Sequence, residues 1–159
     1  MKAIILTYAP VRDFEREILL RTKIFKLALN QHASDLKPNA RIITDYILPR
    51  ILKTCSERII SVREKLRCYS LRVEYPNIEF KGSTIIAGVE YLISKGYDEI
   101  LIVGDNKVNS LEFREEVNRE LNKLKSKAKI YQYSKGNFNL GVKSISEFIH
   151  LPSRSAGED

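Results

Sequence analysis

The sequence of 159 residues contains only two cysteines, two histidines, one methionine and no tryptophan. Cys55 and Cys68 do not form a CxxC pair, and two histidines do not complete a zinc site of the usual spacing with them. No segment approaches the roughly 18 consecutive apolar residues that a transmembrane helix needs. The apolar run at residues 2–8 lacks the features of an export signal. We therefore expect a cytoplasmic, reduced protein without a membrane span.

Several catalytic and phosphate-binding motifs are also missing. The sequence contains no GxxxxGK[ST] and no GxGxxG after its first apolar run, which argues against a P-loop kinase and a standard NAD-dependent enzyme. It suggests no Ser/His/Asp or Cys/His nucleophilic arrangement. What it does contain is 43% hydrophobic and 30% charged residues, a balance typical of a globular domain with a substantial core. We expect a single domain over residues 1–150 and a disordered tail over 151–159.

The chain is basic, with a formal net charge of +7. This balance favours an anionic partner such as a nucleotide, a nucleic acid or an acidic membrane surface. The basic residues are spread along the chain, and their densest run, at 123–129, ends a predicted helix where cations suit the helix dipole. A nucleic-acid-binding module is one interpretation, and a lysine-rich solvated surface is another.

Short apolar runs alternate with helical patterns along the sequence. The predicted strands are residues 2–8, 41–44, 58–62, 99–103 and 129–133, with two further candidates at 69–74 and 78–80. The predicted helices are residues 14–30, 46–53, 84–95, a segment that Asn109 and Glu112 open, and 142–149. This alternation predicts an α/β fold, a three-layer Rossmann-like domain with a mainly parallel sheet. A hairpin within residues 63–81 remains an alternative.

In an open parallel sheet, ligands bind beyond the carboxyl ends of the strands. The predicted topology brings a set of small, polar, acidic and basic residues to that edge. These candidate binding residues are Thr7, Tyr8, Asp45, Gly82, Ser83, Thr84, Gly104, Asp105, Asn106, Lys107, Ser134 and Lys135. Their convergence at one edge is the main indication of a functional site.

Each of these residues has a functional and a purely structural interpretation. The segment Gly82–Thr84 offers backbone N–H groups and hydroxyls that suit a phosphate, or it caps the helix that follows. Asp45 and Asp105 are candidate catalytic carboxylates that would orient a ribose or hold Mg²⁺, or they end strands as ordinary turn residues. Lys107 and Lys135 would offset phosphate charge, or they are solvated surface lysines.

Two segments carry a resemblance to known transferases. Gly82–Val89, followed by Gly96–Asp105, resembles a core shared by two Rossmann-like groups. One group is the bacterial sialyltransferases active on lipooligosaccharide. The other contains archaeal hydroxymethylpterin diphosphokinases and motility-accessory proteins of flagellin glycosylation. In both, a helix led by Gly and Ser runs into an apolar strand followed by Gly and Asp. The segments Ile130–Gly136 and Thr44–Tyr46 resemble a later strand and a second-strand ending of these proteins.

The resemblance, which covers mainly residues 82–106, implies a nucleotide or nucleotide-sugar pocket. Its lining would be Gly82, Ser83, Thr84, Gly104 and Asp105. We therefore expect a nucleotide- or nucleotide-sugar-dependent transferase for glycosyl or diphosphoryl transfer, with Mg²⁺ as a candidate cofactor. The alternatives are a basic nucleic-acid-binding module and a non-catalytic small-molecule-binding domain on the same fold.

Overall fold

Eight strands form one sheet in the computed structural model, which describes residues 1–7, 11–30, 32–44, 57–62, 73–104, 111–136 and 138–150. The strand order is β5-β4-β3-β2-β1-β6-β7-β8, and every neighbouring pair is parallel. The strands are β1 (Lys2–Leu6), β2 (Phe25–Leu29), β3 (Ala40–Ile43), β4 (Arg58–Ser61), β5 (Val73–Glu74), β6 (Glu99–Val103), β7 (Lys129–Gln132) and β8 (Gly141–Val142).

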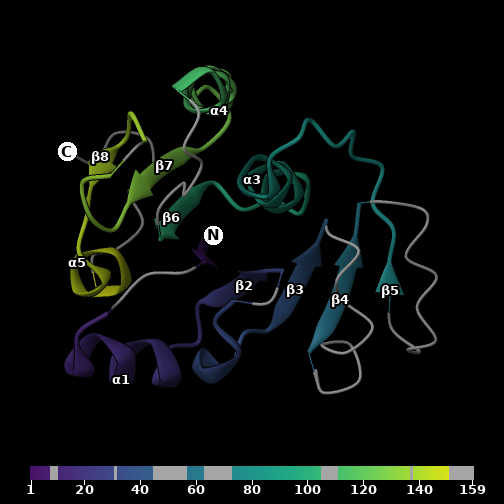
Figure 1. Ribbon diagram of the computed structural model, residues 1–159. Helices are drawn as coiled ribbons and strands as arrows, with labels where there is room; N and C mark the ends of the chain where they lie inside the picture. Colours follow the sequence, from purple (N-terminus) through teal and green to yellow (C-terminus); the bar gives the residue numbers. More distant parts are fainter. Residues whose placement is uncertain are drawn as a thin grey trace.

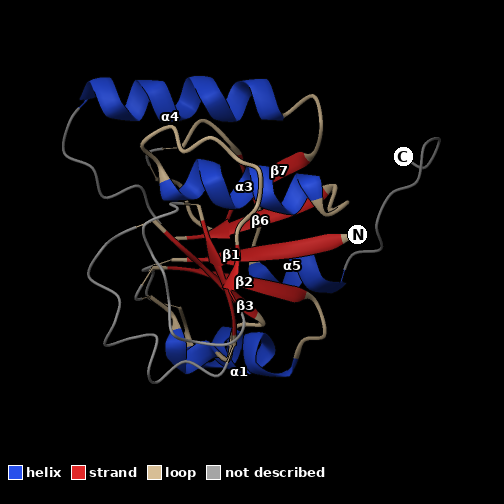
Figure 2. Cartoon of the chain, turned by 90° about the vertical axis from the view of Figure 1, so that its right-hand side faces the viewer, coloured by secondary structure: helices blue, strands red, loops and turns tan. Residues whose placement is uncertain are grey.

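Helices cover both faces of this sheet, which makes three layers (Figures 1 and 2). Figure 2 shows α3 (Thr84–Ser94) and α4 (Leu111–Leu124) on one face, and α1 (Asp13–Arg21) and α5 (Ile145–His150) on the other. A 3-10 turn, η1 (Ser34–Leu36), packs beside α1. The predicted α/β class with a mainly parallel sheet is therefore confirmed.

The central strand β1 explains why the first apolar run has no polar face. Ala3 and Ile5 pack toward α3, whereas Ile4 and Leu6 pack toward α1 and α5, and all four are completely buried. A strand covered by helices on both faces buries every side chain, so its sequence is continuously apolar. The same holds for β6, whose five residues are all buried.

The predicted helix over residues 14–30 is wrong in its second half. Helix α1 ends at Arg21, and Phe25–Leu29 is the strand β2, paired with β1 and β3. The period of two shows in the packing, because Leu27 and Leu29 face α3 while Lys26 points to the other face. The buried ammonium of Lys26 donates to the carbonyls of Leu19 at 2.6 Å and Leu36 at 2.9 Å. This lysine therefore fastens α1 and η1 to the sheet although its residue type suits a helix.

Three smaller predictions also need correction. In the described part of this segment, residues 73–81, strand β5 pairs parallel with β4 and residues 78–80 are not a strand, so the two candidate strands at 69–74 and 78–80 do not form a hairpin. The predicted helix 142–149 is shorter, because β8 adds to the sheet edge before α5 begins at Ile145. The predicted helix 46–53, Asn109 and the tail 151–159 lie outside the described residues.

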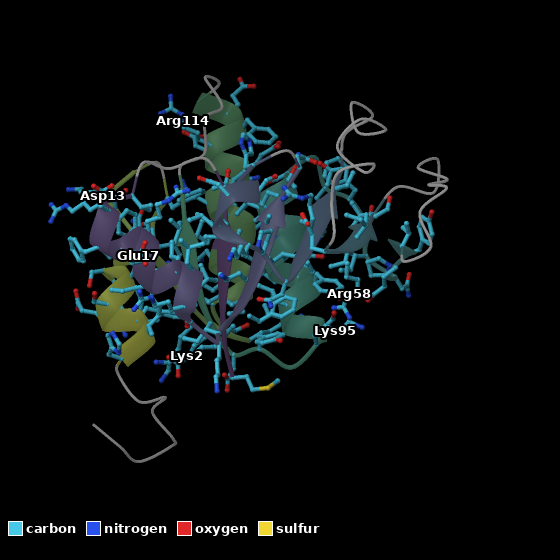
Figure 3. The ribbon with its side chains drawn as sticks, turned by 90° about the horizontal axis from the view of Figure 1, so that it is seen from below. Lys2, Asp13, Glu17, Arg58, Lys95 and Arg114 are labelled. Atoms are coloured by element: carbon cyan, nitrogen blue, oxygen red, sulfur yellow. The ribbon has the colours of Figure 1, made fainter. Side chains whose placement is uncertain are left out.

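The strand order reverses direction between β1 and β6. From β1 the chain adds β2 to β5 on one side, then crosses through α3 to add β6 to β8 on the other side. The helices that follow β1 and β6, α1 and α4, lie on opposite faces of the sheet, and open α/β sheets bind their ligands at such a switch point. In Figure 3, Asp13 and Arg114 mark this edge, and Lys2, Arg58 and Lys95 mark the opposite one. No described helix is long and apolar enough to cross a membrane.

Candidate functional site

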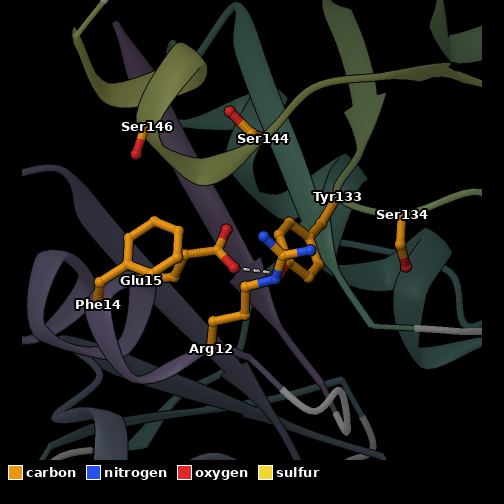
Figure 4. Close-up of a pocket in the computed structure, with 7 residues that line it drawn as sticks. All are labelled: Arg12, Phe14, Glu15, Tyr133, Ser134, Ser144 and Ser146. Carbon is orange, nitrogen blue, oxygen red and sulfur yellow. Dashed lines mark hydrogen bonds between the residues drawn. The ribbon is translucent and has the colours of Figure 1, made fainter.

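A pocket of about 560 Å³ lies at the carboxyl edge, on the face that α1 and α5 cover (Figure 4). It is bounded by the start of α1, the segment after β7 and the start of α5. The lining residues are Arg12, Phe14, Glu15, Tyr133, Ser134, Ser144 and Ser146. Because α1 follows β1 and Ser134 follows β7, the pocket lies beside the β1–β6 switch point. Its volume falls within the range of small-molecule sites, roughly 300–1,000 Å³.

The centre of the pocket is a hydrogen bond between Tyr133 and Glu15. The phenol O–H of Tyr133 donates to Oε1 of Glu15. Glu15 is buried, with only 4% of its surface exposed. Burial raises the pKa of Tyr133 to about 12, and the hydrogen bond to Glu15 adds to this rise, while the charge of Arg12 opposes it. The phenol therefore keeps its proton at neutral pH and holds the carboxylate of Glu15 in place.

Arg12 brings a positive charge to the same pocket. It occupies the N-cap position of α1 and is exposed. Figure 4 shows its guanidinium close to Glu15 and Tyr133, but no ion pair joins Arg12 to Glu15. Among the described residues, nothing accepts a hydrogen bond from its side chain, so its donors remain available to an anion.

The far wall of the pocket is the start of α5. The Oγ of Ser144 accepts a hydrogen bond from the N–H of Glu147 at 3.1 Å, and Glu147 Oε1 accepts from the N–H of Ser144 at 3.3 Å. This reciprocal capping box fixes the entry of the chain into α5. Ser146 and the exposed Ser134 add hydroxyls, and Phe14, which is 56% exposed, adds an aromatic face.

A second polar cluster lies at the carboxyl edge on the opposite face, where α3 begins. Asn30 Oδ1 accepts from the N–H of Thr44 at 3.0 Å, and the hydroxyls of Thr44 and Thr84 are 2.7 Å apart. The side-chain amide of Asn30 donates to Thr84 Oγ1 at 3.3 Å. Asn30 has a φ of +48°, a left-handed conformation that asparagine tolerates better than most residues. The cluster ties the ends of β2 and β3 to the start of α3.

Arg41 supports this cluster from inside the protein. Its guanidinium donates to the carbonyls of Asn30 at 2.7 Å and His32 at 2.6 Å, and Nε pairs with Glu57 at 2.6 Å. The residue is completely buried, so these partners replace the water that would otherwise stabilise its charge. Arg41 is thus a positioning residue for the β2–β3 connection.

The segment Gly82–Thr84 has the geometry of a helix cap. Gly82 has a φ of +85°, a conformation that favours glycine, and Ser83 Oγ accepts from the N–H of Ile86 at 3.4 Å. Because Thr84 bonds within the cluster of Asn30 and Thr44, both hydroxyls already have partners. The structure therefore shows the capping role, and phosphate binding at this helix start remains a prediction.

The other predicted site residues fall into two groups. The N–H of Thr7 donates to Val103 at 3.0 Å where β1 ends, and Gly104 follows β6 with a φ of +141°. Ser134 lines the pocket, and the exposed Lys135 follows it. The remaining predicted residues, Tyr8, Asp45, Asp105, Asn106 and Lys107, lie outside the described residues. Their catalytic, Mg²⁺-binding and phosphate roles remain predictions.

The described part of the chain contains no group of three or more His, Cys, Asp or Glu side chains that could hold a metal ion. Sequence reasoning missed Arg12, Glu15 and Asn30 as site residues. A helix that follows the first parallel strand must begin at the carboxyl edge, and this rule would have pointed to Arg12 and Glu15. Asn30 was not recognised as a site residue because the sequence pattern predicts it as the last residue of the helix 14–30.

No protein-family model matches the chain, and neither the curated proteins nor the solved structures give a significant match. The interpretation of the site therefore depends on the geometry of this chain alone.

Proposed function

We propose that the protein is a nucleotide- or nucleotide-sugar-dependent transferase that binds its ligand at the carboxyl edge of the sheet. The observation that supports this proposal most is the position of the 560 Å³ pocket beside the β1–β6 switch point. Open α/β sheets bind their ligands in this crevice, where the loops of adjacent strands separate.

The chemistry of the pocket is consistent with transfer from a phosphorylated donor. Such reactions depend mainly on positioning and on stabilising the charge that develops on the leaving phosphate. Arg12 supplies a guanidinium without an ion-pair partner among the described residues. Asp105, the next residue after Gly104 in the sequence, is the residue we expect to orient a ribose or Mg²⁺. A covalent nucleophile is not required.

Thermal unfolding with a panel of nucleotides and nucleotide sugars, with and without Mg²⁺, tests the proposal. A ligand at about 100 times its dissociation constant stabilises a protein by roughly 2.7 kcal/mol, which raises the melting temperature by several degrees. The expected result is a shift specific to one nucleotide class, followed by turnover of that nucleotide when acceptors are added.

Absence of a shift with any nucleotide would contradict the proposal. Binding without turnover, unaffected by Asp105→Asn, would instead support a non-catalytic binding domain. Binding of RNA or DNA that weakens steeply with salt would support the nucleic-acid alternative, which the net charge of +7 suggests.

A further inference from the structure

The pocket between α1, β7 and α5 carries an inference about the class of compound that it binds. Building on the proposed function, we propose that this pocket recognises an anionic polyol, a sugar that carries a phosphate or a carboxylate. Glu15 accepts hydrogen bonds from the sugar hydroxyls, and Arg12 binds the anionic group.

The carboxylate of Glu15 has acceptor capacity that the protein does not use. The residue is 96% buried yet lines the pocket, and Oε1 accepts from Tyr133. Within the described residues, no donor bonds to Oε2. Oε2 is not among the buried polar atoms of the described residues that lack a partner, so solvent reaches it in the pocket. A ligand hydroxyl can donate to this acceptor in place of water, whereas an ether or carbonyl oxygen cannot.

Tyr133 makes Glu15 a specific acceptor. Because the phenol donates to Oε1, it restrains the position of the carboxylate and leaves Oε2 for the ligand. Figure 4 shows Glu15 between Phe14 and Tyr133, with Ser144, which precedes α5, and Ser146 of α5 across the pocket. Tyr133 is therefore a positioning residue, and Glu15 is the residue that contacts the sugar.

Arg12 and Glu15 together require two features of one ligand. An inorganic anion satisfies Arg12 but meets the negative charge of Glu15, and a neutral sugar satisfies Glu15 but leaves the guanidinium without an anion. A sugar phosphate or sugar acid supplies both groups at neighbouring positions. The hydroxyls of Ser134 and Ser146 and the exposed ring of Phe14 add polar contacts and an apolar face for the rest of the sugar.

Calorimetric titration of the full chain tests this inference. The probes are glucose 1-phosphate, ribose 5-phosphate and glucuronate, compared with inorganic phosphate and glucose. We expect at least one anionic sugar to bind ten times or more tightly than both inorganic phosphate and glucose. Preference for the phosphates or for glucuronate identifies the anionic group. Equal affinity for inorganic phosphate and the sugar phosphates, or no binding by any anionic sugar, would overturn the inference without any variant.

Variants then assign the contacts. Glu15→Gln keeps an oxygen for the phenol of Tyr133 but replaces the other acceptor with a donor. We expect it to weaken anionic-sugar binding by about 10- to 100-fold, whereas inorganic phosphate should bind no more weakly than to the wild type, because the repelling charge is gone. Arg12→Gln is expected to weaken both. Tyr133→Phe is expected to weaken only the sugars, which a general structural defect would not do.

The matched control is Glu17→Gln, on the same helix and 61% exposed at its side chain. It should bind every probe like the wild type, and a loss equal to that of Glu15→Gln would overturn the assignment. The outcome is separable from the proposed function. Nucleotide binding that Glu15→Gln does not change overturns this inference alone. Anionic-sugar binding without any nucleotide effect overturns the proposed transferase alone.

Discussion

Replacing Arg41 with alanine should destabilise the protein more than any exposed arginine does. The substitution removes a completely buried guanidinium, leaves Glu57 without its 2.6 Å partner and takes donors from the carbonyls of Asn30 and His32. Breaking a buried ion pair by removing one partner costs about 3–5 kcal/mol. For a domain of this length, each kcal/mol lowers the melting temperature by about 2–4 °C, so a loss of roughly 6–20 °C is expected.

Differential scanning calorimetry of Arg41→Ala measures this loss, and Arg21→Ala is the control. Arg21 is 84% exposed at its side chain and pairs with Glu17 at 3.5 Å, so its removal should leave the melting temperature nearly unchanged. Equal melting temperatures for the two variants would show that the hydrogen bonds of Arg41 do not stabilise the β2–β3 connection. That result would remove the physical basis for the position of Asn30.

Three further predictions concern single contacts. Ser83→Ala removes the cap of α3 and should lower the free energy of unfolding by about 1 kcal/mol in urea denaturation, and an unchanged midpoint would contradict the capping role. Tyr91 and Tyr133 have pKa values raised from 10.0 to about 12, so their stabilisation is complete below pH 10 and is lost as the pH rises to about 12. Absorbance titration at alkaline pH should show tyrosines that form phenolate only near pH 12, and Tyr133→Phe should reduce their number by one. An unchanged number would refute the raised pKa of Tyr133. Asn30→Ala should lower the free energy of unfolding by roughly 1 kcal/mol more than Asn30→Gly does. Both variants lose the hydrogen bonds of Asn30, but only alanine is strained at a φ of +48°. Chemical denaturation that shows the opposite order would contradict this.

The class of fold was predictable because the strongest signals in the sequence are local. The buried strand at 99–103, the Ser83 cap and the Gly96 stop each depend on residues within a few positions. The strand β2 was not predictable by the same means. Lys26 is stabilised inside the protein by carbonyls of α1 and η1, so only the tertiary structure makes this lysine compatible with a buried strand.

The candidate site shows the same division. The rule that ligands bind at the carboxyl edge depends only on strand direction and singled out Ser134, which lines the pocket; its role in binding stays a prediction. Glu15 and Tyr133 are 118 positions apart, and no pattern in the sequence pairs them. Their contact follows from α1 and β7 lying on either side of one pocket, which requires the strand order of the sheet.

The most direct test of the central claim is to locate the bound ligand by amide chemical-shift mapping of the isotope-labelled protein. The titrant is the nucleotide or nucleotide sugar that stabilises the protein most. The account predicts that the largest shifts fall at the carboxyl edge, on the amides of Glu15, Ser134 and Ser146, and that those of Lys2 and Lys95 at the opposite edge stay unchanged. Shifts concentrated at Lys2 and Lys95, with none at the pocket, would contradict it.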